Sequence, residues 1–470
     1  MPRHCLHHTR PIWMRTMKMG ICQMRIRSKP EKAHCHMLPS MLLPPSPLQL
    51  LTPRCPSQLH HWAGPQVLYL SFPRTHARTQ THTAFVIRHG IFATGVVALV
   101  MGTIVTWYNS ILLASLWRFD GKRRVRYRDL ARAIFGEWGY RGVVLFQQIS
   151  SLGNNITIQI AAGTSMKAIY VVYHTDHNIT LQEFIIIFGV LQLALSQLPD
   201  IHSLRWFNGL CTLCTIGFTV TAITMSIYDG TKLDRSTVNY NLQGTTATKL
   251  FGILGALGTI SFSFGDAMLP EIQATVREPT KKNMYKGIGM AYSIITITYW
   301  SLAFIGYWAF GSSVNPYLIN SLTTPTWPII LANIFAIIQI AGCFQIYCRP
   351  TYELLEDKLL HRKESLLSLR NILSRILFTS IYTVLVTLVA AAIPFFSDFV
   401  ALCGAIGFTP LDFILPALAY LKVRKPKNSF VWVVNISIMS IYLVVAVLGS
   451  IGAIRFIIQD TKNYKFFKNL

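Results

Sequence analysis

The sequence is poor in acidic residues and in charge altogether. Asp and Glu number 19 against 43 Lys and Arg, and charged residues make up 13% of the 470 positions, about half the usual share of roughly 25%. Hydrophobic residues make up 52%, and the mean hydropathy is +0.41. These values exclude an ordinary soluble protein and favour an integral membrane protein with many spans. The net charge of +24 lies in and beside short loops between apolar runs, so no nucleic-acid partner is expected.

Catalytic and metal-binding motifs are also missing. The sequence has no Walker loop, no His-Glu-x-x-His and no Gly-x-Ser-x-Gly, so we expect neither an ATP-driven pump nor an enzyme. The nine cysteines lack metal-ligand spacing, and Cys211-x-x-Cys214 lies inside an apolar run where packing explains it. His174-x-x-His177 has no third ligand nearby. We therefore expect no metal and no other cofactor.

Long apolar runs are what the sequence has instead. Ten of them are long enough to cross a bilayer as tilted helices. They are residues 90–117, 142–166, 182–199, 206–228, 250–275, 288–310, 327–348, 376–397, 399–421 and 430–454. A shorter apolar fragment near Gly64 is followed at once by Arg74, Arg78 and Arg88, and we interpret it as an incomplete first helix. The expected fold is all-α, with about 11 transmembrane helices.

The N-terminal segment differs from the rest. Residues 1–61 are rich in Pro, His, Arg and Met, contain Glu31 as their only acid, and lack any run of the roughly 20 apolar residues that a span needs. We expect a disordered tail, with a transit peptide or non-native coding sequence as alternatives. The expected organisation is this tail, a transmembrane domain at 62–455 and a short C-terminal tail at 456–470.

Loop charge predicts the orientation. The connections 118–141, 276–287, 349–375 and 422–429 are rich in Lys and Arg, and the alternate ones, 167–181, 229–249, 311–326 and 397–398, are poor in them. The basic set should face the cytoplasm. The chain would then have a cytoplasmic N-terminus and an extracellular C-terminus, with the plasma membrane as the expected location. The sequon Asn178-Ile179-Thr180 would lie outside, with Asn178 glycosylated.

One apolar run carries residues that contradict a plain spanning helix. Residues 251–276 include Gly265, Asp266, Pro270 and Glu271. Pro270 cannot donate a backbone hydrogen bond, so a carbonyl near Asp266 loses its partner, and Gly265 can take backbone angles that other residues avoid. We predict a break near residues 264–267. Broken helices at mid-membrane are how secondary transporters bind small charged substrates.

Carboxyl groups in such a span are candidates for proton coupling, because a buried carboxyl takes up a proton more readily than a solvated one. Asp266 adjoins the break and ranks first, followed by Glu271 and then Asp412, which lies between Pro410 and Pro416. The alternative is that these groups face a wet vestibule or form structural ion pairs. The nearby series Gly252-x-x-Gly255-x-x-Gly258 favours close helix packing over a dinucleotide loop.

Several short motifs carry a resemblance to a known family. They are Met268–Val276 with Pro279, Lys282–Gly287, Gly306–Gly311, Pro325–Trp327, Leu331–Asn333, Pro350–Glu353, Tyr127–Ala131 and Ile134–Gly136. Together they resemble the plant amino acid permeases of the amino acid/auxin permease family over about residues 90–455. The proline and GABA transporter branches look nearest.

The resemblance implies a LeuT-like fold of two five-helix inverted repeats plus one extra helix. It also implies symport of amino acids with protons, driven by the proton gradient, with substrate held at breaks in helices 1 and 6. Backbone amides of Gly64, Pro65, Gln66 and Val67 mark the break in helix 1, and those free to donate would hold the substrate carboxylate. Carbonyls of Ser263, Phe264, Gly265 and Asp266 would receive its ammonium group. A non-transporting sensor or inactive paralogue stays open because helix 1 is disrupted, and a channel is less favoured.

Overall fold

The computed structural model describes residues 92–174, 179–197, 205–240, 245–265, 268–274, 276–315, 317–323, 325–360 and 368–463. All of them belong to one compact unit, His60–Leu470. The tail at 1–61 and the incomplete first helix lie outside the described residues, as do Asp266 and Asn178. What the sequence predicts for these parts stays a prediction.

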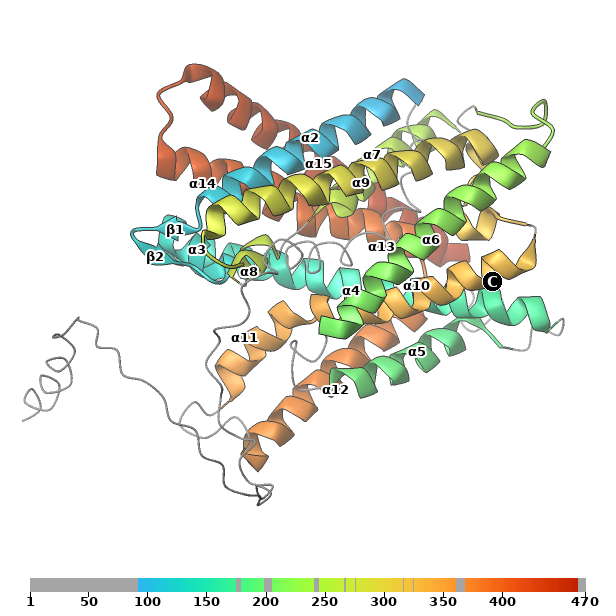
Figure 1. The fold of residues 1–470 in the computed structure, drawn as a ribbon, viewed down its shortest axis with the longest axis horizontal. Coiled ribbons are helices and arrows are strands. Elements are labelled where there is room, and N and C mark those ends of the chain that lie inside the picture. Colours follow the sequence, from blue (N-terminus) through green and yellow to red (C-terminus); the bar gives the residue numbers. More distant parts are fainter. Residues whose placement is uncertain are drawn as a thin grey trace, which may run out of the picture. The chain divides into compact units, whose positions relative to one another are not determined.

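The described residues are helical almost throughout (Figure 1). The long helices are α2 (Phe92–Ser115), α4 (Glu137–Tyr173), α5 (Leu181–Ser196), α6 (Arg205–Lys232), α7 (Thr246–Phe264), α9 (Thr280–Phe310), α10 (Thr326–Tyr347), α12 (Leu369–Ala392) and α15 (Ser429–Asn463). The shorter ones are α3 (Tyr127–Phe135), α8 (Leu269–Ala274), α11 (Arg349–Leu359), α13 (Phe396–Leu402), the π-helix η4 (Cys403–Ile414), α14 (Leu415–Arg424) and the 3-10 turns η2 (Gly311–Ser313) and η3 (Leu318–Ser321). Strand β1 (Arg118–Phe119) pairs antiparallel with β2 (Lys122–Arg123).

Each of the ten predicted apolar runs corresponds to a helix or to consecutive helices in the structure. Within the described residues, eight segments are long and apolar enough to cross a membrane. The other two are α5, which is apolar but has 16 residues, and α4, which has 37 residues. Helix α4 buries Gln147, Ser151 and Asn155 among other polar side chains, which lowers its mean hydropathy. Helix α15 continues to Asn463, past the predicted end at 454 and into the segment expected as a tail.

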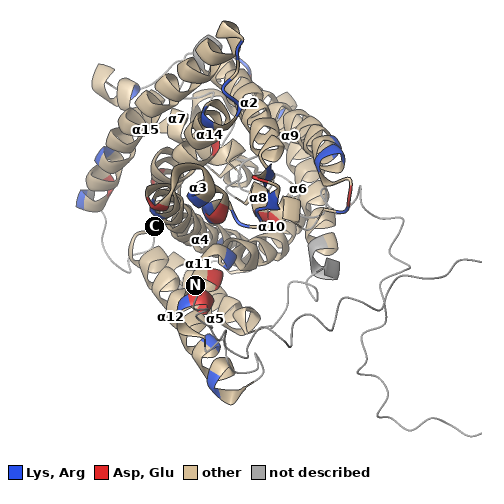
Figure 2. Ribbon diagram, turned by 90° about the vertical axis from the view of Figure 1, so that its left-hand side faces the viewer, with Lys and Arg blue, Asp and Glu red and all other residues tan. Residues whose placement is uncertain are grey.

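The basic connections gather at one end of the bundle, and Figure 2 looks onto this end. Ion pairs and one hydrogen bond join all four connections to one another or to the end of α2. They are Arg118–Glu278 (3.0 Å), Arg126–Glu353 (3.2 Å), Arg128–Asp357 (2.8 Å) and Arg424 Nη2 to the Ser115 carbonyl (3.3 Å). The charge pattern therefore predicted correctly which connections lie together. That this end faces the cytoplasm stays a prediction.

The opposite end collects the connections that are poor in basic residues. Arg235, after α6, donates from Nη1 to the carbonyl of Trp308 at 2.7 Å. Asp229 accepts a hydrogen bond from the backbone N–H of Thr323 at 2.9 Å. Each contact joins the end of one of the helices α6 and α9 to the connection that follows the other, and the sequence assigns these two connections to the same side.

The glycines of α7 allow close approach of its neighbours. A Cβ on Gly258 would collide with the carbonyl oxygen of Ala401, and one on Gly404 would collide with the carbonyl oxygen of Gly258. On the α15 side, a Cβ on Gly452 would lie 3.4 Å from the nitrogen of Gly255. The prediction that this glycine series serves helix packing is confirmed for Gly258, whereas a Cβ on Gly255 would have no neighbour within 4 Å.

Candidate functional site

The sixth span is broken where the sequence predicts it. Helix α7 ends at Phe264 and α8 begins at Leu269. Pro270 is the second residue of α8, a position in the first turn where the missing N–H removes no helical hydrogen bond. The short helix α8 then leads to the basic end of the bundle.

The reason inferred for Gly265 is wrong. Its φ of −71° and ψ of 130° are extended backbone angles that any residue adopts. Space is the requirement instead, because a Cβ on Gly265 would collide with the ring of Phe408 in η4. The glycine allows the break in the sixth span to pack directly on the tenth span.

The tenth span has an irregularity of its own at the wide turns of η4. The backbone N–H of Leu415 donates to the carbonyl of Pro410, five residues back. Pro416 follows and has no N–H, so one backbone donor is missing for the carbonyls of Leu411 and Asp412, which lie five and four residues before it. A buried carbonyl without a donor is costly.

Side chains from two other elements supply those donors. The phenol of Tyr127, the first residue of α3, donates to the carbonyl of Leu411 at 2.8 Å. The Nδ2 of Asn109 on α2 donates to the carbonyls of Asp412 and Phe413, both at 3.0 Å. Asn109 is 1% exposed. These bonds hold α2 and α3 against the wide turn of η4.

Glu271 on α8 lies at the beginning of α3. Its Oε1 accepts hydrogen bonds from the backbone N–H of Tyr127 at 3.1 Å and from Nε2 of Gln147 at 3.3 Å. A carboxylate at a helix N-terminus satisfies a free N–H and interacts favourably with the helix dipole. The other oxygen, Oε2, is buried and has no hydrogen-bond partner among the described residues. Glu271 is thus held through one oxygen, and the other is available to a proton.

Tyr127 connects the two irregular spans. Burial raises the pKa of its phenol well above the ordinary value, and the negative charges of Asp412 and Glu271 raise that pKa further. The phenol therefore stays neutral and keeps donating to the carbonyl of Leu411. Two of the three predicted coupling candidates, Glu271 and Asp412, lie around this tyrosine, and the third, Asp266, falls outside the described residues.

Of the other predicted site residues, Ser263 and Phe264 have side chains that form packing contacts, and those of helix 1 lie outside the described residues. The hydroxyl of Ser263 donates to the carbonyl of Thr259 at 2.7 Å. The ring of Phe264 packs on Tyr299, with the centroids 5.6 Å apart. Because these side chains contact other parts of the protein, the prediction that residues 263–266 bind the ammonium group of the substrate concerns their backbone carbonyls. The amides of Gly64–Val67 lie outside the described residues.

Sequence reasoning missed Asn109 and Gln147 as members of the site, and it treated Tyr127 only as part of a motif. The available signal was a polar side chain within an otherwise apolar run. The described residues contain no group of three or more His, Cys, Asp and Glu that could hold a metal ion. Cys211 and Cys214 are buried and free, in agreement with packing.

A sixth span broken between α7 and α8, packed on a tenth span with a π-helical stretch within a bundle of long apolar helices, is an arrangement that agrees with the LeuT-like fold. Solved transporters share the fold. The crystal structure of MhsT in complex with L-phenylalanine aligns with a TM-score of 0.51 and 12% identity, covering 84% of this chain and 99% of that one. Mhp1, a nucleobase-cation-symport-1 family transporter, aligns with a TM-score of 0.50 and 12% identity, covering 86% and 94%.

The chain belongs to the family described as transmembrane amino acid transporter protein, which matches residues 88–459. GABA transporter 1 of Arabidopsis thaliana is 35% identical over 392 residues, covering 81% of this chain and 87% of the relative. Lysine histidine transporter-like 1 of the same plant is 31% identical over 386 residues, covering 79% and 83%. The resemblance to plant amino acid permeases is confirmed.

Proposed function

We propose that the protein is a proton-coupled symporter of neutral or zwitterionic amino acids such as proline or GABA, located in the plasma membrane. The observation that carries the proposal is the carboxyl of Glu271, which lies just after the break in the sixth span. One of its oxygens is buried and has no hydrogen-bond partner among the residues that the structure describes. Proton uptake removes a buried charge there. No enzymatic activity is part of the proposal.

Substrate binding is assigned to the break itself. The carbonyls of residues 263–266 at the end of α7 receive the ammonium group, because a helix C-terminus carries partial negative charge. The amides of residues 64–67 receive the carboxylate. The 35% identity to a protein named GABA transporter 1 supports a substrate with one positive and one negative group.

Protonation of Glu271 also alters the contact between α8 and α3. A neutral carboxyl is a weaker acceptor than a carboxylate for the backbone N–H of Tyr127. Since the phenol of Tyr127 holds the wide turn of the tenth span, the protonation state of the sixth span affects the tenth. Asp266 and Asp412 remain further candidates for the coupling group.

Uptake in proteoliposomes tests the proposal. Labelled proline and GABA are offered at acidic and neutral external pH to the wild type, to Glu271→Gln and to Glu356→Gln. Glu356 forms only a long ion pair with Arg375, at 3.8 Å, and serves as the matched control. We expect acid-stimulated uptake in the wild type and the control, and uptake without pH dependence in Glu271→Gln. Equal pH dependence in all three removes Glu271 from the mechanism, and Asp266→Asn is then tested in the same way.

A non-transporting sensor or inactive paralogue is the second candidate function. Arg74, Arg78 and Arg88 follow the helix 1 fragment, and each Arg at the bilayer centre costs about 2.5–3.5 kcal/mol on the insertion scale. A version with residues 40–90 replaced by an apolar helix broken at Gly-Pro should then transport better than the chain as written. Equal uptake by both versions contradicts this alternative.

The orientation is tested separately from transport. Cysteines placed at positions 125 and 283 should be protected from impermeant reagents added outside intact cells, and Asn178 should carry a glycan. Labelling of either cysteine from outside would reverse the proposed orientation.

A further inference from the structure

The segment between α2 and α4 contains an arginine that its neighbours leave unpaired. Most of the basic side chains here have acidic partners: Arg118 and Arg123 pair with Glu278, Arg126 and Arg128 with Asp357, and Arg132 with Glu137. Arg124 differs. Its backbone N–H donates to the carbonyl of Trp117 at 3.3 Å, but its side-chain Nε is buried without a hydrogen-bond partner in the described part of the chain.

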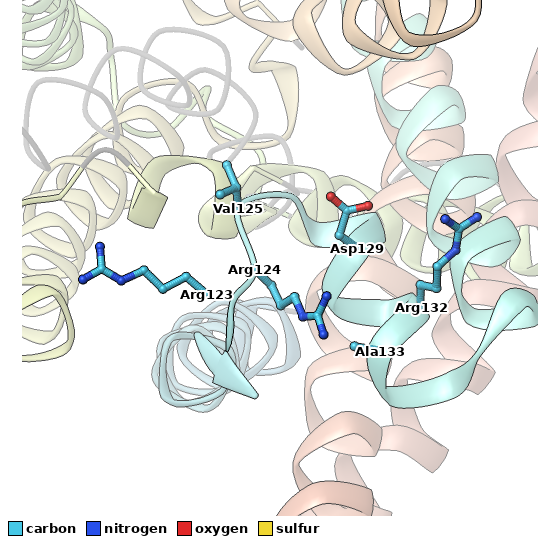
Figure 3. A pocket seen from close by; sticks show the side chains of 6 residues that line it. All are labelled: Arg123, Arg124, Val125, Asp129, Arg132 and Ala133. Atoms are coloured by element: carbon cyan, nitrogen blue, oxygen red, sulfur yellow. The ribbon is translucent and has the colours of Figure 1, made fainter. Parts of the chain in front are cut away.

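This arginine lines a cavity of about 440 Å³ between the β1–β2 hairpin and α3. The lining residues are Arg123, Arg124, Val125, Asp129, Arg132 and Ala133. Figure 3 shows the guanidinium of Arg124 next to Ala133 on α3, with Asp129 and Arg132 projecting from the same helix. The small side chain of Ala133 leaves room beside the guanidinium.

The chemistry of the lining selects an anion. Counted together with the ion-pair partners Arg118, Glu278 and Glu137, the charged lining residues are four arginines and three carboxylates, a surplus of one positive charge. A buried N–H without a partner also requires an acceptor. The planar guanidinium matches the oxygens of a phosphate group, which accept several hydrogen bonds at once. The carboxylate of Asp129 repels an anion in the same space, so it lowers the affinity for an anion.

We propose that this cavity binds a phosphate monoester group. At the basic end of a membrane protein such a group comes from one of two sources, the headgroup of an anionic phospholipid or a soluble organic phosphate. Clusters of Lys and Arg next to a transmembrane helix attract anionic lipids of the cytoplasmic leaflet, and the segment begins directly after α2.

A phosphate in this cavity would affect the contacts of Tyr127 with Glu271 and Leu411. The lining residues of the cavity lie on both sides of Tyr127 in the chain, at 123–125 and at 129–133. Tyr127 in turn contacts Glu271 through its backbone N–H and Leu411 through its phenol. A phosphate bound between the hairpin and α3 therefore stabilises the position of α3. Any resulting effect on transport rests on the proposed function, but the binding itself does not.

Binding to the full-length protein in nanodiscs tests the proposal without measuring transport. Inorganic phosphate and inositol trisphosphate serve as soluble probes in phosphatidylcholine discs. Discs that contain phosphatidylinositol bisphosphate serve as the lipid probe, and discs with phosphatidylserine, whose phosphate is a diester, control for lipid charge. Because inositol trisphosphate shares the phosphoinositide headgroup, tighter binding of a soluble probe than of phosphoinositide in the disc identifies a soluble source, and tighter binding of the phosphoinositide identifies a lipid source. Hydrogen exchange at residues 124–136 should slow with whichever probe binds.

Three variants test whether phosphate binding takes place in this cavity. Arg124→Gln should weaken binding about tenfold, the loss expected for one hydrogen bond between charged groups. Asp129→Asn should strengthen binding, because it removes the opposing charge. Arg141→Gln is the matched control, since Arg141 is an exposed arginine on α4 that lies over the ring of Trp138, and binding should not change.

Three results would overturn the proposal. The first is the absence of saturable binding of every phosphate probe to the wild type. The second is an equal loss in Arg124→Gln and Arg141→Gln, which indicates attraction by net charge alone. The third is unchanged affinity in Asp129→Asn. Because that variant is expected to gain affinity, the test holds even where Arg124→Gln fails to fold.

Discussion

Replacement of Asn109 by leucine should destabilise the protein by an amount that the structure allows us to calculate. The side chain donates to the carbonyls of Asp412 and Phe413, both at 3.0 Å, and leucine has a similar volume but no donor. Pro416 removes a backbone donor from this turn. Each buried carbonyl left without a partner costs about 1–3 kcal/mol, so Asn109→Leu should lose about 2–4 kcal/mol, because Phe413 retains part of its helical bonding.

The measurement is the midpoint of unfolding in a detergent titration of the purified protein. Asn333→Leu is the control, since Asn333 is equally buried on α10 and its Nδ2 donates only to the carbonyl of Ile329 in its own helix, at 2.9 Å. That carbonyl lies one turn back in a regular helix, so the control should lose under about 1 kcal/mol. Equal losses in the two variants, or an unchanged midpoint in Asn109→Leu, would refute the role given to Asn109.

Three further predictions concern the same region and the basic end. Tyr127→Phe should lower stability by about 1–3 kcal/mol, because it leaves the carbonyl of Leu411 without its donor; an unchanged unfolding midpoint would contradict this. Gly265→Ala should cost about 1–3 kcal/mol by overpacking. The same change should cost less in a Phe408→Ala background, which removes the colliding ring, and an equal cost in both backgrounds would argue against the clash. A hydrogen bond from the backbone of Thr280 and two arginines hold the pKa of Glu278 below its ordinary 4.5. The stability that Glu278 contributes is therefore present above pH 4.5 and lost as the pH falls through the lower folded value. The protection of the hairpin amides, measured relative to their intrinsic exchange rate at each pH, should fall there, and pH-independent protection would contradict the ion pairs.

Features that depend on neighbouring residues in the chain could be predicted from the sequence. The apolar runs gave the spanning helices, since a bilayer requires a minimum length of apolar sequence. The position of the break near Gly265 was predicted from the proline and the polar residues within such a run, although the reason inferred for the glycine was wrong, and the grouping of connections followed from their charge. Each of these is a property of a segment taken alone.

Features that depend on the packing of distant segments could not be predicted in this way. Gly265 is required because Phe408 approaches it, and nothing near Gly265 in the sequence indicates that ring. The pairing of Asn109 with the turn at Asp412 joins residues 303 positions apart. The sequence does show that Pro416 frees a carbonyl at Asp412, but it does not show which side chain supplies the donor.

The two bonds of Tyr127 have a consequence for where water enters the protein. One residue holds Glu271 of the sixth span through its backbone N–H and Leu411 of the tenth span through its phenol. If the two spans separate at this end, at least one of these bonds breaks, and either the carbonyl of Leu411 loses its donor or Glu271 keeps only its bond from Gln147. Water is the natural replacement donor. Separation of the spans therefore lets water reach the basic end of the bundle, at Glu271 or at the wide turn of η4, when α3 releases one of the two helices.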